Sequence, residues 1–144
     1  MIVIGDTSGV VAAVNSADPE HHAARRAWRQ ASTTVISPLV FAEIEYVMAR
    51  GGGRPAAYAV NDWLLEQARS PRVQVPEVSA ETLRRARRVQ DRYASLRLGL
   101  TDAVNVILAE AYGTSAVLTL DRRDFRTVRP LTGHEGFLLL PDDL

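Results

Sequence analysis

The chain has 144 residues, of which 47% are hydrophobic and 24% are charged, and its 17 basic and 17 acidic side chains balance. This composition predicts one globular domain over residues 1–144 and excludes a disordered chain or a general polycation. Every basic residue is an arginine and no cysteine is present, which excludes chemistry that needs a thiol, a Schiff-base lysine or a phosphate-loop lysine.

The N-terminal residues carry no basic leader, and their apolar run of residues 2–4 is too short for a signal-peptide core. No segment approaches the roughly 18 to 20 apolar residues that a membrane span needs. We therefore expect a cytoplasmic protein with no membrane segment.

Short apolar runs alternate with amphipathic segments along the whole chain. In chain order, we expect a strand at 2–4, helices at 8–15 and 19–32, a strand at 34–36, helices at 39–50 and 55–68, a strand at 73–75, helices at 80–93 and 102–112, and strands at 116–120 and 137–140. Asp18-Pro19, Ser37-Pro38, Ser79 and Thr101 are typical of helix starts. The alternation predicts an α/β/α sandwich with a central, mostly parallel sheet flanked by helices.

Acidic residues fall at places where open α/β sheets bind ligands. Asp6 and Asp121 come just after predicted buried strands, and the carboxyl ends of parallel strands form the ligand crevice. Asp102 opens an otherwise apolar helix, and each of these three could instead be a turn or cap residue. Glu43 lies in mid-helix among apolar residues, where a carboxylate needs a positive partner. Glu45 lies about 200° further round that helix and is expected to face solvent.

If these carboxylates converge, they would repel one another unless a cation lay between them. Ligands that are all oxygen favour Mg²⁺ or Mn²⁺ over zinc or copper. Such a cluster is suited to phosphodiester hydrolysis, in which a metal activates water and stabilises the leaving oxygen.

Four motifs in order make the chain resemble the PIN-domain nucleases, and most closely the VapC toxins of bacterial type II toxin-antitoxin pairs. The motifs are Ile4-Gly5-Asp6-Thr7-Ser8, Ser37-Pro38 through Ala42-Glu43, Leu100-Thr101-Asp102-Ala103, and Leu118 through Phe125. The resemblance covers nearly the whole chain and implies a PIN-domain fold.

The resemblance implies a divalent-metal pocket formed by Asp6, Glu43, Asp102 and Asp121 as catalytic and metal-binding residues. The fourth motif also offers Asp124, so the choice between Asp121 and Asp124 stays open. Supporting hydrogen bonds are expected from Thr7, Ser8, Thr119 and Asn105. In this hypothesis the ion is held by Asp6, Asp102 and Asp121, and Glu43 orients or deprotonates the attacking water.

The activity implied is a Mg²⁺- or Mn²⁺-dependent endoribonuclease that cleaves transfer or ribosomal RNA and so inhibits translation and growth. Its implied partners are the RNA substrate, a cognate VapB-type antitoxin and a second toxin subunit, in a homodimer and a toxin-antitoxin hetero-oligomer. Two alternatives remain: a housekeeping RNA-processing PIN nuclease, and a non-catalytic PIN interaction module. A receiver domain or a haloacid-dehalogenase-like phosphatase is excluded, because each needs a lysine.

Arginines concentrate in two segments. Residues 81–97 hold six arginines, among them Arg88 and Arg92, and a further group follows the fourth motif. An RNA backbone partner would explain both groups, although the first also fits a solvated helix face. The candidates for RNA contact are Arg88, Arg92, Arg122, Arg123 and Arg126.

Other polar and aromatic side chains are expected to be structural. His21, His22 and His134 are predicted to lie on the surface, away from the acids. The large apolar residues at helical spacing are expected to be mostly core, with part of their surface available to an antitoxin helix or a second subunit. These residues are Trp28, Tyr46, Met48, Trp63 and Leu64.

Overall fold

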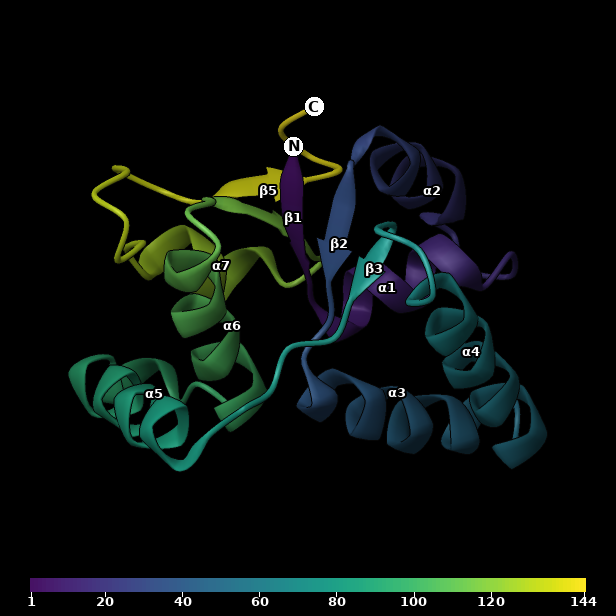
Figure 1. The fold of residues 1–144 in the computed structure, drawn as a ribbon, viewed down its shortest axis with the longest axis horizontal. Coiled ribbons are helices and arrows are strands. Elements are labelled where there is room, and N and C mark those ends of the chain that lie inside the picture. Colours follow the sequence, from purple (N-terminus) through teal and green to yellow (C-terminus); the bar gives the residue numbers. More distant parts are fainter.

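The computed structural model describes all residues 1–144 and contains a five-stranded sheet in which every strand pairing is parallel. The strands are β1 (Ile2–Gly5), β2 (Thr33–Val35), β3 (Val73–Gln74), β4 (Ala116–Leu118) and β5 (Leu138–Leu140). Their order across the sheet is β3-β2-β1-β4-β5 (Figure 1). The predicted α/β architecture is confirmed, including the edge strand close to the C-terminus.

The order of the strands creates a switch point between β1 and β4. The chain adds β2 and β3 on one side of β1 and then returns to add β4 and β5 on the other side. Ile4 is paired with Val117, and the Asp6 amide donates to the carbonyl of Leu118 at 3.0 Å. Open parallel sheets bind ligands outside the strand ends at this kind of reversal, so the first and fourth motifs meet where a site is expected.

Helices cover both faces of the sheet. They are α1 (Thr7–Val14), α2 (His21–Gln30), α3 (Pro38–Gly51), α4 (Arg54–Gln67), α5 (Ala80–Arg92), α6 (Leu100–Ala111) and α7 (Arg122–Thr127), with a 3₁₀ turn at Ala94–Leu96. One layer holds α1 to α4 and the opposite layer holds α5 to α7 (Figure 1). None of these helices combines the length and the apolar character needed to cross a bilayer.

Side chains alternate between the two cores along each strand. Val3 and Leu118 belong to the core under α1 to α4, whereas Ile4 and Val117 belong to the core under α5 to α7. Because both faces are covered, the central strands β1 and β4 are continuously apolar, as predicted, whereas β2 and β3 also carry polar residues. Trp28 and Leu64 are buried and Met48 and Trp63 pack against the same core, but the expectation of burial is wrong for Tyr46, whose exposed fraction is 66%.

The helix starts were only partly predictable. Ser37 and Ser79 are N-caps, and their hydroxyls accept from the amides of Leu39 and Thr82 at 3.1 Å. The predicted cap at Thr101 is wrong, because α6 begins at Leu100 after Gly99 and Thr101 is buried. At Asp18 the carboxylate accepts from the Glu20 amide at 2.9 Å, and this turn delays the start of α2 to His21.

The strand predicted at residues 116–120 is shorter because its last residue pairs with a side chain. The Leu120 amide donates to Ser8 Oγ at 2.9 Å instead of to a strand neighbour, so β4 ends at Leu118. The six-residue helix α7 that follows was not predicted, because one and a half turns are too short to establish a helical period.

Gly9 lets α1 lie directly against the end of β4. A Cβ atom at this position would lie 2.3 Å from the carbonyl oxygen of Leu118 and 2.7 Å from the amide of Thr119. Both neighbours are backbone atoms and cannot move without displacing the strand. A glycine is therefore required for the first and fourth motifs to touch.

We expect Gly9→Ala to lower the melting temperature by about 3–9 °C, because overpacking costs about 1–3 kcal/mol in a chain of this length. Thermal unfolding followed by circular dichroism measures the change. Gly51→Ala is the matched control, since nothing lies within 4 Å of a Cβ there, and it should leave the melting temperature unchanged or slightly raised. Equal melting temperatures for the two variants would contradict the close-contact argument.

Candidate metal centre

A pocket of about 410 Å³ opens where β1 and β4 end. Its lining residues are Asp6, Thr7, Ser8, Val11, Asp18, Glu43, Val47, Asp102, Leu120 and Asp121. Five of these side chains are carboxylates and none is an arginine. The chain therefore builds a negative pocket without supplying a cation of its own.

Asp6 and Asp121 occupy N-cap positions, but neither caps its helix. Asp6 precedes α1 and Asp121 precedes α7, and neither side chain accepts a capping hydrogen bond. Asp6 instead accepts from Thr119 Oγ1 at 2.7 Å and from Asn105 Nδ2 at 3.3 Å, and only 4% of its surface is exposed. Turn or cap chemistry thus does not explain these two acids, and their side chains are directed to the pocket.

Thr119 joins the two motifs that meet at the switch point. Its hydroxyl donates to Asp6 and accepts from the Asp121 amide at 2.9 Å. Ser8 Oγ lies 3.3 Å from the same hydroxyl. These contacts place Thr119 and Ser8 directly beside the predicted acids, and they fix the Asp6 carboxylate in one orientation.

Glu43 reaches the pocket from α3, and its carboxylate is held by Thr7. The Thr7 hydroxyl donates to Glu43 Oε1 at 2.6 Å. The sequence suggested apolar surroundings for Glu43, but the residue is exposed on the pocket wall, so no positive partner is needed to keep it in the fold. Glu45 faces elsewhere, as predicted: it is exposed and lines a separate hollow beside Tyr46 and Arg50.

Three carboxylates lie close enough together to share one ion. Asp102, from the first turn of α6, offers an oxygen within 4.8 Å of oxygens from Asp121 and Asp124. Asp121 and Asp124 both belong to this group, so the structure brings together the two acids between which the sequence left a choice. Asp6 and Glu43 complete the acidic wall of the pocket.

Burial and mutual repulsion raise the pKa values of these acids. Burial is the main cause at Asp6, whose pKa rises to about 6 although the Thr119 bond opposes the change. Asp102 is raised further, to a pKa of about 8, by burial and then by the charges of Asp6, Asp121, Glu43 and Asp124. The pKa of Asp121 is also raised, first by burial and then by Asp124. The protonated, neutral form of these acids is thus favoured at this edge of the sheet unless a cation binds between them.

One residue that lines the pocket, Asp18, was not expected there from the sequence, and one expected residue, Asn105, has a buried polar atom without a partner. Asp18 lines the pocket from the loop between α1 and α2, and its sequence context suggested only a helix start. Asn105 was expected to support the acids, and its amide nitrogen does bond Asp6, but its buried Oδ1 atom has no partner. Only the fold reveals that Asp18 reaches the pocket and that the Asn105 Oδ1 atom has no partner, because both depend on neighbours distant in the sequence.

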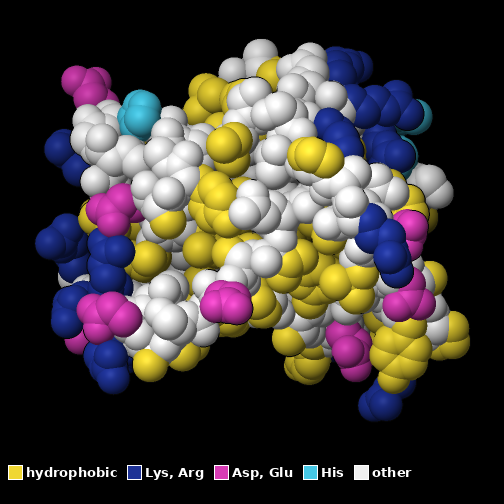
Figure 2. All heavy atoms as spheres, viewed as in Figure 1, with side chains coloured by type: hydrophobic (Ala, Val, Ile, Leu, Met, Phe, Trp, Pro, Cys, Tyr) yellow, Lys and Arg dark blue, Asp and Glu magenta, His cyan; other side chains and the backbone are white.

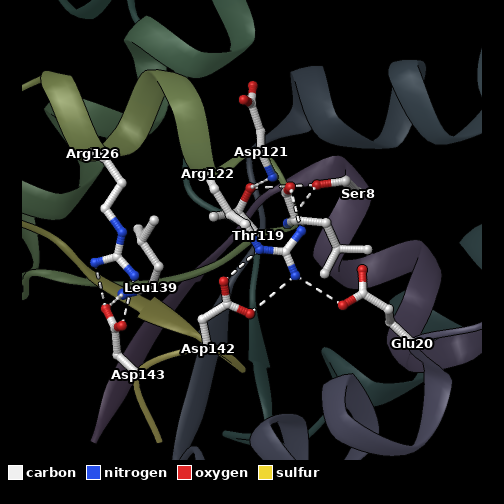
Figure 3. A network of polar contacts seen from close by, with 10 residues as sticks. Ser8, Glu20, Thr119, Asp121, Arg122, Arg126, Leu139, Asp142 and Asp143 are labelled. Carbon is white, nitrogen blue, oxygen red and sulfur yellow. Dashed lines mark hydrogen bonds and ion pairs between the residues drawn. The ribbon is translucent and has the colours of Figure 1, made fainter.

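Two of the arginines expected to contact RNA are held in ion pairs. Arg122 donates to Asp142 and to Glu20, the latter at 2.8 Å, and also to the carbonyl of Leu120 at 3.2 Å. Figure 3 shows its guanidinium directed away from the Asp121 carboxylate. Arg126 binds both carboxylate oxygens of Asp143, at 2.6 and 2.8 Å. These pairs fasten the C-terminal tail and the α1–α2 loop to α7.

The other three candidates carry no ion pair. Arg123 lies in the first turn of α7, where its charge acts on Asp121. Arg88 and Arg92 are exposed on α5 and line a hollow of about 160 Å³ with Val89 and Ile107. The neighbouring Arg85 differs, because it pairs with Glu110 at 2.5 Å. Arg88, Arg92 and Arg123 are therefore the free cations among the residues expected to contact RNA.

The raised pKa values predict that the metal-free protein loses stability as pH rises from about 5 to about 8. The folded state holds protons on Asp6 and Asp102 that the unfolded state has released, so the free energy of unfolding falls as pH passes through the folded pKa values. Melting temperatures measured in the presence of a chelator test this directly.

Asp102→Asn should remove most of the decrease in melting temperature with pH. It should also raise the melting temperature near pH 8 by about 3 °C or more, since it removes one partly buried charge that is repelled by four other carboxylates. Asp142 and Asp143 do not interfere, because their arginine partners hold their pKa values below the usual range. A wild-type melting temperature that stays constant between about pH 5 and about pH 8 would show that the carboxylates of the pocket do not repel one another.

Comparison with known proteins agrees with this geometry. The PIN domain family profile matches residues 3–130. Ribonuclease VapC26 of Mycobacterium tuberculosis is 35% identical over 140 residues, covering 96% of this chain and all of that protein.

Two solved structures of related toxins are also similar to this chain. The crystal structure of Mycobacterium tuberculosis VapC20, described as a sarcin-ricin loop cleaving toxin, superimposes with a TM-score of 0.75 at 25% identity over 90% of this chain and all of that one. VapBC2 from Rickettsia felis, solved bound to a DNA fragment from its promoter, shares the fold at a TM-score of 0.65 and 18% identity, over 96% of this chain and 97% of that one. The chain therefore belongs to the PIN domain family and is related within it to the VapC ribonucleases.

Proposed function

We propose that the protein is a divalent-metal-dependent endoribonuclease toxin that cleaves cellular RNA and thereby inhibits translation and growth. The observation that carries the proposal is the open pocket at the switch point, where five carboxylates gather without a cation from the chain. The 35% identity to a VapC ribonuclease over nearly the whole chain supports the same activity.

The donor set fits Mg²⁺ or Mn²⁺. All of the candidate ligand atoms are carboxylate oxygens, which hard divalent cations prefer, and no histidine or cysteine is available for zinc. Asp6, Asp102 and Asp121 are the proposed ligands, with Glu43 and Asp124 as additional donors. When bound, the ion supplies Lewis acidity toward water and the scissile phosphate.

Glu43 is the proposed general base. Its Oε1 atom is occupied by the Thr7 hydroxyl, so its second oxygen is free to hold a water molecule and accept its proton. The exposed position of Glu43 on the pocket wall keeps that oxygen accessible. Thr119 and Asn105 act on Asp6 rather than on substrate, because their hydrogen bonds fix the orientation of its carboxylate, and Ser8 supports Thr119.

The RNA strand would be held by the candidate arginines that have no ion pair, Arg88, Arg92 and Arg123. Arg123 lies beside Asp121, and Arg88 and Arg92 lie on the exposed side of α5. Guanidinium groups without carboxylate partners can bind phosphates in a bidentate manner. Arg122 and Arg126 have the structural role of holding the tail, since their donors are already used.

A VapB-type antitoxin and a second copy of this chain are the proposed protein partners. The solved complex of the Rickettsia felis pair supports an antitoxin. The apolar side chains exposed on α3 and α4 suit such a contact, namely Tyr46, Val47, Tyr58 and Leu65. A housekeeping RNA-processing nuclease would share the pocket but lack an antitoxin, and a non-catalytic module would not cleave RNA.

The test is incubation of purified protein with total cellular RNA in Mg²⁺ or Mn²⁺, with new 5′ ends mapped by sequencing. We expect cuts at a small number of sites that disappear in EDTA. Asp6→Asn should lower the cleavage rate to below about one thousandth, and Glu43→Gln should lower it by about 10²–10⁴-fold, the usual contribution of a general base.

Glu45→Gln is the matched control on the same helix, and it should cut at the wild-type rate because Glu45 lies outside the pocket. Far-ultraviolet circular dichroism establishes that each variant is folded. Cleavage that survives both Asp6→Asn and EDTA would contradict the proposal, and a folded protein that cuts no RNA with either metal would favour the non-catalytic module.

A further inference from the structure

Helix α2 carries a row of arginine and histidine side chains on the side of the molecule away from α5. His21, Arg25 and Arg29 follow one another at intervals of four residues, with His22 and Arg26 alongside. Figure 2 shows basic side chains gathered at this corner, near the position of α2 in Figure 1. Residues four apart on a helix lie about 5–6 Å from each other, so the row forms a continuous ridge.

Two hollows flank this ridge. One, of about 380 Å³, is lined only by His21, His22, Arg25, Arg26 and Arg29. The other, of about 430 Å³, lies between the ridge and the neighbouring helices, and it is lined by Val14, Ser16 and Trp63 together with His21, Arg25 and Arg29. A flexible ligand could therefore contact the basic side chains of the ridge from either side.

No carboxylate neutralises the ridge. None of its arginines takes part in an ion pair, and Glu20, the acid just before α2, is bound to Arg122 on α7. Arg25 packs over the ring of Trp63, 5.2 Å from its centroid, which fixes its guanidinium. Partial burial, followed by the charges of Arg29 and Arg72, lowers the pKa of Arg25. The arginines thus repel one another and have no carboxylate partner, although Arg25 Nη1 donates to the carbonyl of Ala13 at 3.4 Å.

The ridge is connected to the acidic pocket through one loop. Asp18 and Ser16 both belong to the loop between α1 and α2, and Asp18 lines the pocket whereas Ser16 lines the hollow beside Arg25. Helix α1 has Thr7 at the pocket and Val14 at the hollow, and its eight residues correspond to a length of about 12 Å. A single strand of several nucleotides is long enough to span this separation.

We propose that the α2 ridge, formed by His21, His22, Arg25, Arg26 and Arg29, is a second binding surface for the phosphate backbone of the RNA substrate. This inference rests on the proposed nuclease function and adds a site outside the pocket. The acids of the pocket repel phosphates, so a cationic surface nearby would hold the strand while one phosphodiester enters the pocket. An acidic protein segment would match the charge as well, but a flexible polyanion can make contacts in both hollows beside the ridge. We therefore favour RNA as the occupant.

The test compares Arg26→Gln/Arg29→Gln with the matched control Arg50→Gln/Arg54→Gln, which removes the same charge at the junction of α3 and α4. All four side chains are exposed and without carboxylate partners, so both variants should fold. The probe for binding is a fluorescein-labelled oligouridylate of about 20 nucleotides, long enough to cover pocket and ridge. Fluorescence anisotropy in EDTA over a series of salt concentrations measures binding without cleavage.

We expect the α2 variant to bind several-fold more weakly than wild type and to lower the slope of log K against log salt by about 1.4, the loss of two single-strand phosphate contacts. The control should retain the wild-type slope. In Mg²⁺ or Mn²⁺, the α2 variant should cleave the long RNA more slowly but a dinucleotide at the wild-type rate, because the single phosphodiester of a dinucleotide must lie in the pocket and leaves no phosphate for the ridge.

Equal affinity and slope for the two variants would overturn the proposal. So would a loss of antitoxin binding by the α2 variant with RNA binding unchanged, because the ridge would then be a protein interface. These outcomes are distinct from failure of the nuclease assignment, in which wild-type protein itself neither binds nor cuts RNA.

Discussion

Repulsion among the carboxylates at the β1–β4 edge is the constraint on which the rest of the structure depends. The acids come from four different elements, and each must be held in place by contacts that the repulsion opposes. Thr119 and Asn105 hold Asp6, Thr7 holds Glu43, and the two apolar cores hold the strands and α6. The fold therefore stores unfavourable electrostatic energy at one edge, a common property of functional sites.

The distribution of arginine follows from the same constraint. A guanidinium inside the pocket would neutralise the acids and remove their affinity for an external cation. The chain instead keeps its arginines out of the pocket lining, and some fasten separate segments together whereas others have no carboxylate partner. Arg122 shows the first use, since it ties α7 to the α1–α2 loop and to the tail while it points away from Asp121 (Figure 3). Arg123 and the ridge on α2 show the second.

The sequence predicted those features that depend on local chemistry. Buried strands and serine-capped helices were confirmed because periodicity and caps act over a few residues. Asp6, Glu43, Asp102 and Asp121 were recognised from strand ends, helix position and motif resemblance, and they line one pocket. Features set by distant contacts were not predictable: the ion pairs of Arg122 join residues 20, 122 and 142, and the exposure of Tyr46 depends on how α3 meets α4.

The central claim to test is that the crowded acids form a site for a divalent cation. Its most direct test is calorimetric titration of metal-free protein with Mg²⁺ and Mn²⁺ at pH 7, in two buffers with different ionisation enthalpies. With the pKa of Asp102 near 8, the metal-free protein holds a proton that the ion must displace, so we expect binding that releases about one proton per ion. Asp102→Asn should bind more weakly and release none. Absence of binding, or wild-type affinity in Asp102→Asn, would contradict the claim.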